Sequence, residues 1–353
     1  MKFSKIGTTG LDISRVCLGT MTWGQQNSED QAHQQMDYAL DKGINFFDTA
    51  ELYAVPTSAA TQGKTEEFIG TWFQKNSNRK DIILASKVAG PGIPWIRNAS
   101  PLTGKSVSEA IEGSLKRLQT DYIDLYQLHW PNRPFPHFGQ NRAGLIDFAK
   151  EDSKQIEDNL LDILEALGKI VKDGKVRFIG LSDDSAWGIM KYLQLADQKS
   201  LPRIQSIQNE FSLLNRSDDP YVAEVCVREN VSYLPWSPLA TGMLSGKYQN
   251  GQIPEGSRWH TEKQLRDEFD SFRKTPVALS AVGEYMSIAA KHNLSVTQMA
   301  LKFVDMQNFV TSTIIGATSM EQLKSNIDAF NITLTDEVIK EIESVYRKYP
   351  IVY

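Results

Sequence analysis

The chain has 353 residues, of which 41% are hydrophobic and 23% are charged, and its formal net charge is −5. This composition is typical of a globular protein that buries a full core, and it excludes an intrinsically disordered chain. The negative charge gives no overall positive field that would attract nucleic acid or an anionic membrane surface, so we expect neither as a partner.

The amino-terminal segment predicts a small hairpin, because residues 1–13 place Gly-Thr-Thr-Gly, at 7–10, between two short extended runs. No apolar run follows the first charged residues, so we expect no signal peptide, and no run reaches the ~18 apolar residues of a membrane helix. By elimination, we expect a cytoplasmic protein. Cys17 and Cys226 stand alone in apolar stretches and predict buried thiols, with neither a disulfide framework nor a metal site.

Short apolar runs alternate with amphipathic stretches along most of the chain. The runs are rich in Val, Ile, Leu and Phe, as expected of parallel strands that are covered on both faces. They occupy residues 15–19, 45–49, 82–87, 122–129, 176–182, 204–208, 232–237 and 312–316. The helical patterns occupy residues 29–42, 65–75, 106–118, 155–172, 186–198, 221–228, 296–307 and 320–329. Eight strand–helix units predict an α/β fold, a (β/α)8 TIM barrel, in a single domain over residues 1–353.

Two long segments interrupt the regular alternation. Residues 131–154 follow the fourth predicted strand, and residues 239–275 follow the seventh. Loops of this length without structure of their own are usually lids or binding loops. The prolines and glycines of the first segment predict that residues 132–153 form a flap over the substrate end, outside the barrel wall.

Four polar side chains are predicted to meet at the carboxyl-terminal rim, where the active sites of such barrels lie. Asp48 ends the second strand with Tyr53 just beyond it, Lys87 ends the third strand and His129 ends the fourth. Tyrosine has a pKa of about 10; we expect a neighbouring ammonium to lower it, while a carboxylate keeps that ammonium charged. The imidazole can donate a hydrogen bond to a carbonyl oxygen. Such a group could protonate the alkoxide left by hydride addition, with the hydride supplied by a cofactor.

Each of these side chains also has a structural interpretation. Asp48 could cap a turn, Lys87 could be a solvated surface group, His129 a satisfied structural histidine and Tyr53 a packing residue. A Schiff-base aldolase that uses Lys87 is a further alternative, although Asp48 opposes the lowered lysine pKa that such an enzyme needs.

Three segments resemble the aldo-keto reductase family. They are Asn-Phe-Phe-Asp-Thr-Ala-Glu-Leu-Tyr at 45–53, Ala-Ser-Lys at 85–87 and Asp-Tyr-Ile-Asp-Leu-Tyr-Gln-Leu-His-Trp at 121–130, and the resemblance runs from about Lys5 to about Val345. It is strongest to the branch of bacterial Tas-like reductases and extends, further off, to the potassium-channel β-subunits. The resemblance implies an NADPH-dependent reductase of aldehydes or ketones with Asp48, Tyr53, Lys87 and His129 as its catalytic residues. It leaves open an NADPH-binding regulatory or redox-sensing subunit with slow turnover.

The same resemblance implies where NADP(H) binds. No Gly-x-Gly-x-x-Gly follows a strand, so a Rossmann site is not expected; barrels often hold phosphates at the loops after the seventh and eighth strands. Residues 236–248 and 316–326, in those loops, are similar to the nicotinamide-dinucleotide site of the family. The residues implied to contact the cofactor are Gly19, Thr20, Met21, Gln25, Ser182, Gln208, Trp236, Ser237, Pro238, Leu239, Gly242, Lys247, Arg258, Gly316, Thr318, Gln322 and Asn326.

Each part of the cofactor has its own implied contacts. Trp236 stacks on the nicotinamide ring, and Ser182 with Gln208 holds the carboxamide. The residues assigned to the pyrophosphate are Ser237, Leu239 and Gly242; those assigned to the 2′-phosphate are Lys247, Arg258 and Thr318; those assigned to the adenine are Gln322 and Asn326. The glycines could equally be ordinary turn residues, and Trp236 a core aromatic.

Two features depart from the family. Asp183 follows Ser182 where many relatives have Ser-Asn, so the amide that would contact the cofactor is replaced by an acid. Residues 54–65 are longer than the glycine-rich turn common after the family's tyrosine, so we expect a differently shaped mouth. A substrate pocket could be walled by aromatic residues, or these could simply pack: Trp23, Trp95, Trp130 and residues 131–138.

Overall fold

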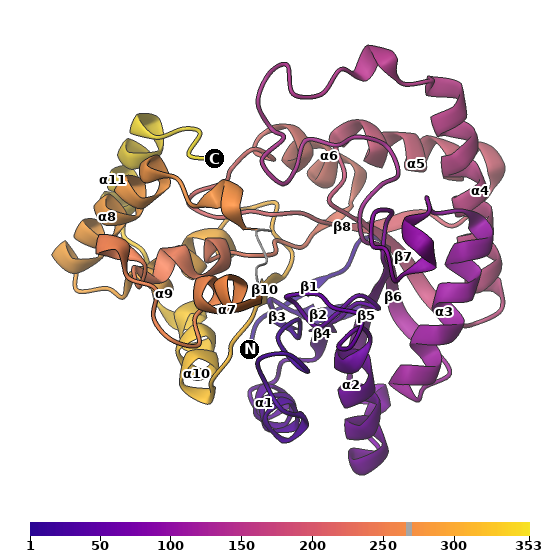
Figure 1. Ribbon diagram of the computed structural model, residues 1–353, viewed down its shortest axis with the longest axis horizontal. Helices are drawn as coiled ribbons and strands as arrows, with labels where there is room; N and C mark the ends of the chain where they lie inside the picture. Colours follow the sequence, from indigo (N-terminus) through magenta and orange to yellow (C-terminus); the bar gives the residue numbers. More distant parts are fainter. Residues whose placement is uncertain (266–269) are drawn as a thin grey trace.

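The computed structural model describes residues 1–265 and 270–353, and it contains a parallel barrel (Figure 1). The strands lie in the order β10-β3-β4-β5-β6-β7-β8-β9, and each pairs in parallel with its neighbours. Their bounds are β3 (Val16–Gly19), β4 (Phe46–Asp48), β5 (Ile83–Val88), β6 (Ile123–Leu128), β7 (Val176–Ser182), β8 (Ile204–Gln208), β9 (Ser232–Tyr233) and β10 (Thr313–Ile315). The amide of Ile314 donates to the carbonyl of Pro235 at 3.0 Å, which joins β10 to the chain after β9. This arrangement confirms the predicted (β/α)8 barrel.

Helices connect the strands and pack around the barrel. Their bounds are α1 (Glu29–Asp41), α2 (Lys64–Asn76), α3 (Gly104–Leu118), α4 (Ser153–Lys172), α5 (Ala186–Lys199), α6 (Tyr221–Glu229), α7 (Arg258–Leu265), α8 (Pro276–Lys291), α9 (Val296–Asp305), α10 (Met320–Asp328) and α11 (Asp336–Lys348). Many begin at a Ser, Thr or Asp side chain that accepts a backbone hydrogen bond from the first turn; Ser28 and Thr103, for example, each form a capping box. Figure 1 shows α2, α3, α4 and α5 around one side of the barrel, and α8 beside α11 on the other.

Three of these helices, α7, α8 and α11, were not among the predicted elements. Residues 239–275, which we name the β9 loop, were predicted to lack structure, but they contain α7 and the short 3-10 turns η4 (Ala240–Ser245), η5 (Gln249–Gly251) and η6 (Ser271–Arg273). Residues 266–269 of that predicted loop lie outside the described residues. Helix α11 packs on α8 outside the eight strand–helix units, so the barrel repeat gave no reason to expect it.

The predicted amino-terminal hairpin is present as β1 (Phe3–Lys5) and β2 (Asp12–Ser14). It lies across the amino-terminal ends of two barrel strands, because the amide of Gly7 donates to Ser232 Oγ at 2.8 Å and that of Thr8 to Gln205 Oε1 at 2.8 Å. Gly7 has a φ of +48°, and a Cβ there would lie 2.3 Å from Gln205 Oε1, so the close approach requires glycine. The hairpin therefore covers the end of the barrel opposite the predicted catalytic rim.

The interior of the barrel is apolar below that rim. Side chains from the hairpin and from several strands form one cluster there, with Cys17, Phe46 and Leu125 fully or almost fully buried. Both cysteines are free and buried, as predicted. Within residues 1–265 and 270–353, no helix has the length and apolar character needed to cross a membrane.

Candidate active site

The predicted catalytic side chains meet at one rim because β4, β5 and β6 are neighbours in the barrel. The ammonium of Lys87 lies 2.7 Å from Asp48 Oδ2 and 3.3 Å from the hydroxyl of Tyr53, and it also donates to the carbonyl of Thr49 at 2.9 Å. The ring of His129 meets that of Tyr53 edge to face, with centroids 5.6 Å apart. The structure thus joins Asp48, Lys87 and Tyr53 into one chain of contacts, with His129 beside the phenol.

Burial and charge set the protonation of this group. Burial alone would lower the pKa of Lys87, but the Asp48 carboxylate and the Tyr53 phenol outweigh it, and the net shift is upward. Burial raises the pKa of Tyr53, and the Lys87 ammonium opposes that effect without overcoming it. The sequence had led us to expect a lowered tyrosine pKa; the difference arises because the phenolate would be fully enclosed.

His129 is held in its neutral form. Burial lowers the pKa of its imidazole well below the ordinary value, and the Lys87 ammonium lowers it further. Its Nδ1 is buried and has no hydrogen-bond partner among the described residues. A buried, unpartnered ring nitrogen beside a phenol is suited to bind a polar atom of a ligand.

The second oxygen of Asp48 is held by two amides. Gln208 Nε2 donates to Asp48 Oδ1 at 2.8 Å, and Gln127 Nε2 lies 3.4 Å from the same oxygen. Gln127 lies on β6, two residues before His129, and sequence reasoning missed it. Its place at the end of a strand on the same side as His129 is the signal that could have found it, because alternate residues of a strand share a face.

Glu51 is another residue that sequence reasoning left without a role, although it lies within the matched segment. Its carboxylate accepts from the amide of Ala89 at 2.6 Å and from Arg97 at 2.6 and 3.0 Å. Glu51 is 4% exposed, so this bidentate pair is largely shielded from water. It fixes the loop that carries Tyr53 against the loop that follows β5.

The predicted nicotinamide residues lie next to the catalytic group. Ser182 and Gln208 are partners in the register of β7 and β8. Trp236 follows β9, and its indole Nε1 donates to Asp183 Oδ1 at 3.1 Å. Asp183 is thus placed against the predicted stacking residue, although the sequence gave no role to its carboxylate.

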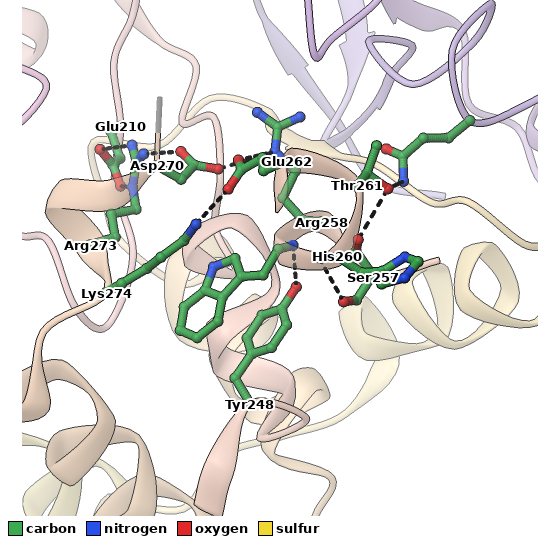
Figure 2. Close-up of polar contacts among 12 residues, drawn as sticks. Glu210, Tyr248, Ser257, Arg258, His260, Thr261, Glu262, Asp270, Arg273 and Lys274 are labelled. Carbon is green, nitrogen blue, oxygen red and sulfur yellow. Dashed lines mark hydrogen bonds and ion pairs between the residues drawn. The ribbon is translucent and has the colours of Figure 1, made fainter. Parts of the chain in front are cut away.

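The two predicted phosphate-binding cations lie in the β9 loop. Arg258 Nε donates to Glu262 at 2.8 Å and to Asp270 at 3.1 Å, and Figure 2 shows its terminal nitrogens pointing away from these carboxylates. The Nη1 of Arg258 is buried without a hydrogen-bond partner among the described residues. Lys247 is half-buried, and its pKa is lowered by burial, with no described carboxylate opposing that shift. Arg258 thus already pairs with two carboxylates through Nε and keeps one unpaired, buried terminal nitrogen.

The other predicted cofactor residues after β9 form the turn that leads into the β9 loop. Ser237 has a φ of +48° and Gly242 a φ of +95°, and the amide of Gly242 donates to the carbonyl of Leu239 at 3.0 Å. Pro238 lies between Ser237 and Leu239 in this turn. A Cβ at Gly242 would lie 3.2 Å from Lys247 Cε, so the turn brings the glycine and the lysine together.

The predicted adenine-side residues stabilise the turn after β10. Gln322 Oε1 accepts from the amide of Thr318 at 3.0 Å, and Asn326 Nδ2 donates to the carbonyl of Gly316 at 3.0 Å. A Cβ at Gly316 would meet no heavy atom within 4 Å, so the space above this residue is open. These side chains have a structural role. The contact of Gln322 uses its Oε1, which leaves its Nε2 available to donate a hydrogen bond to a ligand.

The predicted residues after β3 pack beneath the site. A Cβ at Gly19 would lie 2.8 Å from Ile314 Cγ2, so this glycine is required by packing against β10. Thr20 Oγ1 donates to the carbonyl of Asp48 at 2.8 Å, and the carbonyl of Met21 accepts from the amide of Val55 at 2.7 Å. Gln25 is half-buried in the following turn.

Residues 131–154, which we name the insert, begin at the catalytic rim. Arg133 forms a buried ion pair with Asp184. His137 is buried, and its Nδ1 lies 3.8 Å from Asp183 Oδ1. The ring of Phe138 lies 6.0 Å from that of Trp236, whereas most of residues 140–150 are exposed. The first part of the insert therefore packs on the rim, and the remainder projects from it.

The three tryptophans considered as pocket walls have different positions. Trp23 is fully buried and donates to Gln35 Oε1 at 3.1 Å, so it belongs to the core. Trp95 is 40% exposed. The ring centroids of Trp130 and His129 lie 4.9 Å apart, so Trp130 is the one of the three that contacts the predicted catalytic group.

Comparisons with known protein sequences find similarity along nearly the whole chain. A model of the "Aldo/keto reductase family" matches residues 15–347. The chain is 46% identical over 352 residues to Protein tas of Escherichia coli (strain K12), covering 99% of each chain. It is 31% identical over 350 residues to the Uncharacterized oxidoreductase YrpG of Bacillus subtilis (strain 168), covering 98% of this chain and 96% of that one. An aldo-keto reductase of Babesia bovis is 33% identical over 282 residues, covering 76% of this chain and 96% of its own length.

Proposed function

The chain belongs to the aldo/keto reductase family, with a Tas-like sequence over its full length, and from this premise we propose that it reduces an aldehyde or ketone with NADPH, using Tyr53 as the general acid. The observation that carries the proposal is the buried chain of contacts from Asp48 through Lys87 to Tyr53, beside the neutral imidazole of His129. NADPH, when bound, supplies the hydride.

The residues of this chain supply the rest of the reaction. The single N–H of neutral His129 donates a hydrogen bond to the carbonyl oxygen and orients it. The Tyr53 hydroxyl, protonated at neutral pH because its pKa is raised by burial, gives its proton to the oxygen that becomes the alcohol. Lys87 stabilises the phenolate left behind, and Asp48 keeps Lys87 charged and in place.

The phosphate end of the cofactor fits the β9 loop. No described carboxylate acts on the pKa of Lys247, which burial lowers, and the Nη1 of Arg258 is buried without a described partner. A 2′-phosphate carries nearly two negative charges near neutral pH and offers acceptors to both side chains. We therefore propose NADPH in preference to NADH, with these two residues responsible for the choice.

A steady-state assay tests the proposal. NADPH and then NADH are mixed with the protein and a panel of aldehydes and ketones, and loss of the reduced nicotinamide absorbance is followed together with formation of the alcohol. We expect turnover with NADPH and much less with NADH. Absence of turnover together with absence of NADPH binding would contradict the proposed function.

Two other functions were open at the level of sequence. A Schiff-base aldolase needs a lysine with a lowered pKa, and Asp48 together with Tyr53 holds the pKa of Lys87 above its usual range, so this alternative is disfavoured. A cofactor-sensing subunit with slow turnover remains the second candidate. It is supported by contacts of Gln26 Nε2 with Gly256 O and Thr261 Oγ1, both at 3.4 Å, which join the loop after β3 to the β9 loop and would slow cofactor exchange.

A further inference from the structure

Asp183 places a buried acid at the catalytic rim that the proposed mechanism does not use. It follows β7, is 3% exposed and adopts a left-handed backbone with a φ of +49°. Its Oδ1 accepts the indole N–H of Trp236 at 3.1 Å and lies 3.8 Å from Nδ1 of His137 in the insert. Burying a carboxyl costs free energy, and buried acids of this kind are often found at functional sites.

The charge of this carboxyl is not balanced by a neighbouring Lys or Arg. Arg273, the nearby guanidinium, is fully buried but is already shared between Glu210, at 2.6 Å, and Asp270 (Figure 2). Among residues 1–265 and 270–353, the basic side chain nearest to Asp183 is the imidazole of His137, whose Nδ1 lies 3.8 Å from Oδ1 and which carries charge only when protonated. Ionised Asp183 therefore projects negative potential into the site.

This potential falls where the reaction has to occur. Burial is the main cause of the raised pKa of Tyr53, and the Asp183 carboxylate raises this pKa further. The two groups therefore interact electrostatically. A carbonyl held by Tyr53 and His129 can receive hydride only from a donor on this rim. Strand β7 lies next to β6 in the barrel, and Trp236 donates a hydrogen bond to Asp183. A nicotinamide ring that stacked on Trp236, as the sequence implies, would therefore lie beside the carboxyl.

We propose that the Asp183 carboxylate makes the site bind NADP⁺ more tightly than NADPH, because it attracts the positive charge that the nicotinamide ring carries only when oxidised. This inference rests on the proposed function. The overall reaction is NADPH, carbonyl and one proton giving NADP⁺ and alcohol. The hydride takes an electron pair from the ring to the carbonyl carbon, Tyr53 gives its proton to the oxygen, and the ring becomes cationic.

Coulomb's law sets the size of the effect. At the effective dielectric constant of about 20 that suits protein sites, a unit charge several ångströms from the ring changes the ratio of the two dissociation constants roughly ten- to a hundredfold. Each tenfold change lowers the reduction potential of the bound two-electron couple by about 30 mV. Because its reduction potential is lower, bound NADPH would be a stronger reductant than free NADPH. The tightly bound NADP⁺ would dissociate slowly.

The preference is expected to depend on pH. Burial raises the pKa of Asp183 to about 7; His137, the Trp236 hydrogen bond and Arg273 lower it, and Glu210 raises it. Tyr53 and Tyr233 also face the carboxyl, and both are protonated near neutral pH because burial raises their pKa. Asp183 is therefore charged above about pH 7 and protonated below it, so the preference for NADP⁺ is present above this pH and disappears as the pH falls.

The test compares dissociation constants, with no turnover needed. NADPH and NADP⁺ are titrated separately, by tryptophan fluorescence or calorimetry, into the wild type and Asp183→Asn at about pH 6 and about pH 8. Ionisation of the 2′-phosphate is common to both nucleotides and cancels in their ratio. In Asp183→Asn the amide oxygen can still accept from Trp236, so geometry is kept while charge is removed.

The expected result is specific. In the wild type, the ratio of the NADPH to the NADP⁺ dissociation constant rises about tenfold or more from about pH 6 to about pH 8. In Asp183→Asn, the ratio of the two dissociation constants is lower than in the wild type and is the same at both pH values. Glu165→Gln, which removes one charge from an exposed position on α4, should behave as the wild type. Equal ratios in Asp183→Asn and the wild type at about pH 8 would overturn the inference.

The controls separate the possible failures. If Asp183→Asn does not fold, as judged by circular dichroism, Asp183→Ser takes its place, and a ratio equal to that of the wild type at about pH 8 overturns the inference. If the wild type binds neither nucleotide, the proposed function fails first. If it binds both with the same affinity at high and low pH, the function stands and the role of Asp183 falls.

Discussion

The guanidinium of Arg258 is bonded through its Nε to two buried carboxylates, those of Glu262 at 2.8 Å and Asp270 at 3.1 Å (Figure 2). Burial raises the pKa of Glu262 to about 7, whereas Asp270, facing Arg273 and Arg258, has a lowered pKa despite its own burial. Arg258 thus bonds two carboxylates through Nε, whereas its buried Nη1 has no hydrogen-bond partner among the described residues. The two roles predict different results on substitution.

The structural role of Arg258 is tested by the stability of a variant that lacks its side chain. Arg258→Ala leaves Glu262 and Asp270 buried with one cation fewer, and breaking a buried pair in this way typically costs ~3–5 kcal/mol. Urea denaturation measures the loss. Arg228→Ala is the matched control, because its ion pair with Glu224 is exposed and i,i+4, and such pairs are worth less than ~1 kcal/mol. Equal stability of Arg258→Ala and wild type would show that the buried cluster does not depend on Arg258.

Lys247 is the cleaner probe of cofactor choice, because burial alone shifts its pKa and no described carboxylate contributes. Lys247→Ala should weaken NADPH binding roughly ten- to a hundredfold, since a charged hydrogen bond contributes roughly 1.5–3 kcal/mol. NADH binding should barely change, because NADH lacks the 2′-phosphate. Isothermal titration at fixed salt measures both constants, and Lys247→Arg should retain most of the preference. Equal weakening of the two coenzymes would remove Lys247 from phosphate recognition.

The sequence was sufficient to predict the barrel and the meeting of the four polar side chains at its rim, because both follow from the order of the strands. Asp48, Lys87 and His129 end consecutive parallel strands, and consecutive strands of a barrel are neighbours, so their meeting could be predicted. The pKa of Tyr53 could not, because its direction depends on how completely the phenol is enclosed. The partners of Arg258 depend on how the β9 loop folds back, which no local pattern reports.

The insert is expected to control substrate preference through its rim-facing part. Phe138→Ala removes the ring that packs against Trp236, with centroids 6.0 Å apart, and should change kcat/KM for bulky aldehydes relative to small ones by about tenfold. Replacing residues 140–150 with a short turn should leave the barrel folded, because most of these residues are exposed and Arg133 and His137 are kept. Unfolding of the shortened chain, or unchanged selectivity of Phe138→Ala, would count against this assignment.

Asp183 also predicts a dependence of stability on pH that needs no nucleotide. The pKa of Asp183 in the folded state, about 7, lies above the ordinary value of 3.8. The contribution of Asp183 to the free energy of unfolding is therefore fully present below the ordinary pKa and is lost as the pH rises through about 7. Asp183→Asn should therefore gain stability relative to the wild type between about pH 5 and about pH 8. Thermal denaturation of both proteins across this range measures the difference. A constant difference would mean that Asp183 is ionised throughout.

The departures from the sequence-based expectations have physical causes. Helix α11 has a strongly amphipathic pattern but packs on α8 outside the barrel repeat. Glu51 could not be assigned because its partner Arg97 lies 46 residues away, and only the fold brings them together. Trp23 was open as a pocket wall, but its fully buried indole donates to Gln35, which places it in the core.

The most direct test of the account is the turnover of Tyr53→Phe with NADPH and an aldehyde that the wild type reduces. The phenylalanine ring keeps the packing against His129 but has no proton to give. We predict a loss of kcat of ~10²–10⁴-fold, as is typical when a general acid is removed, with the NADPH dissociation constant nearly unchanged. A Tyr53→Phe variant that keeps most of the wild-type turnover would contradict the central claim that Tyr53 donates the proton.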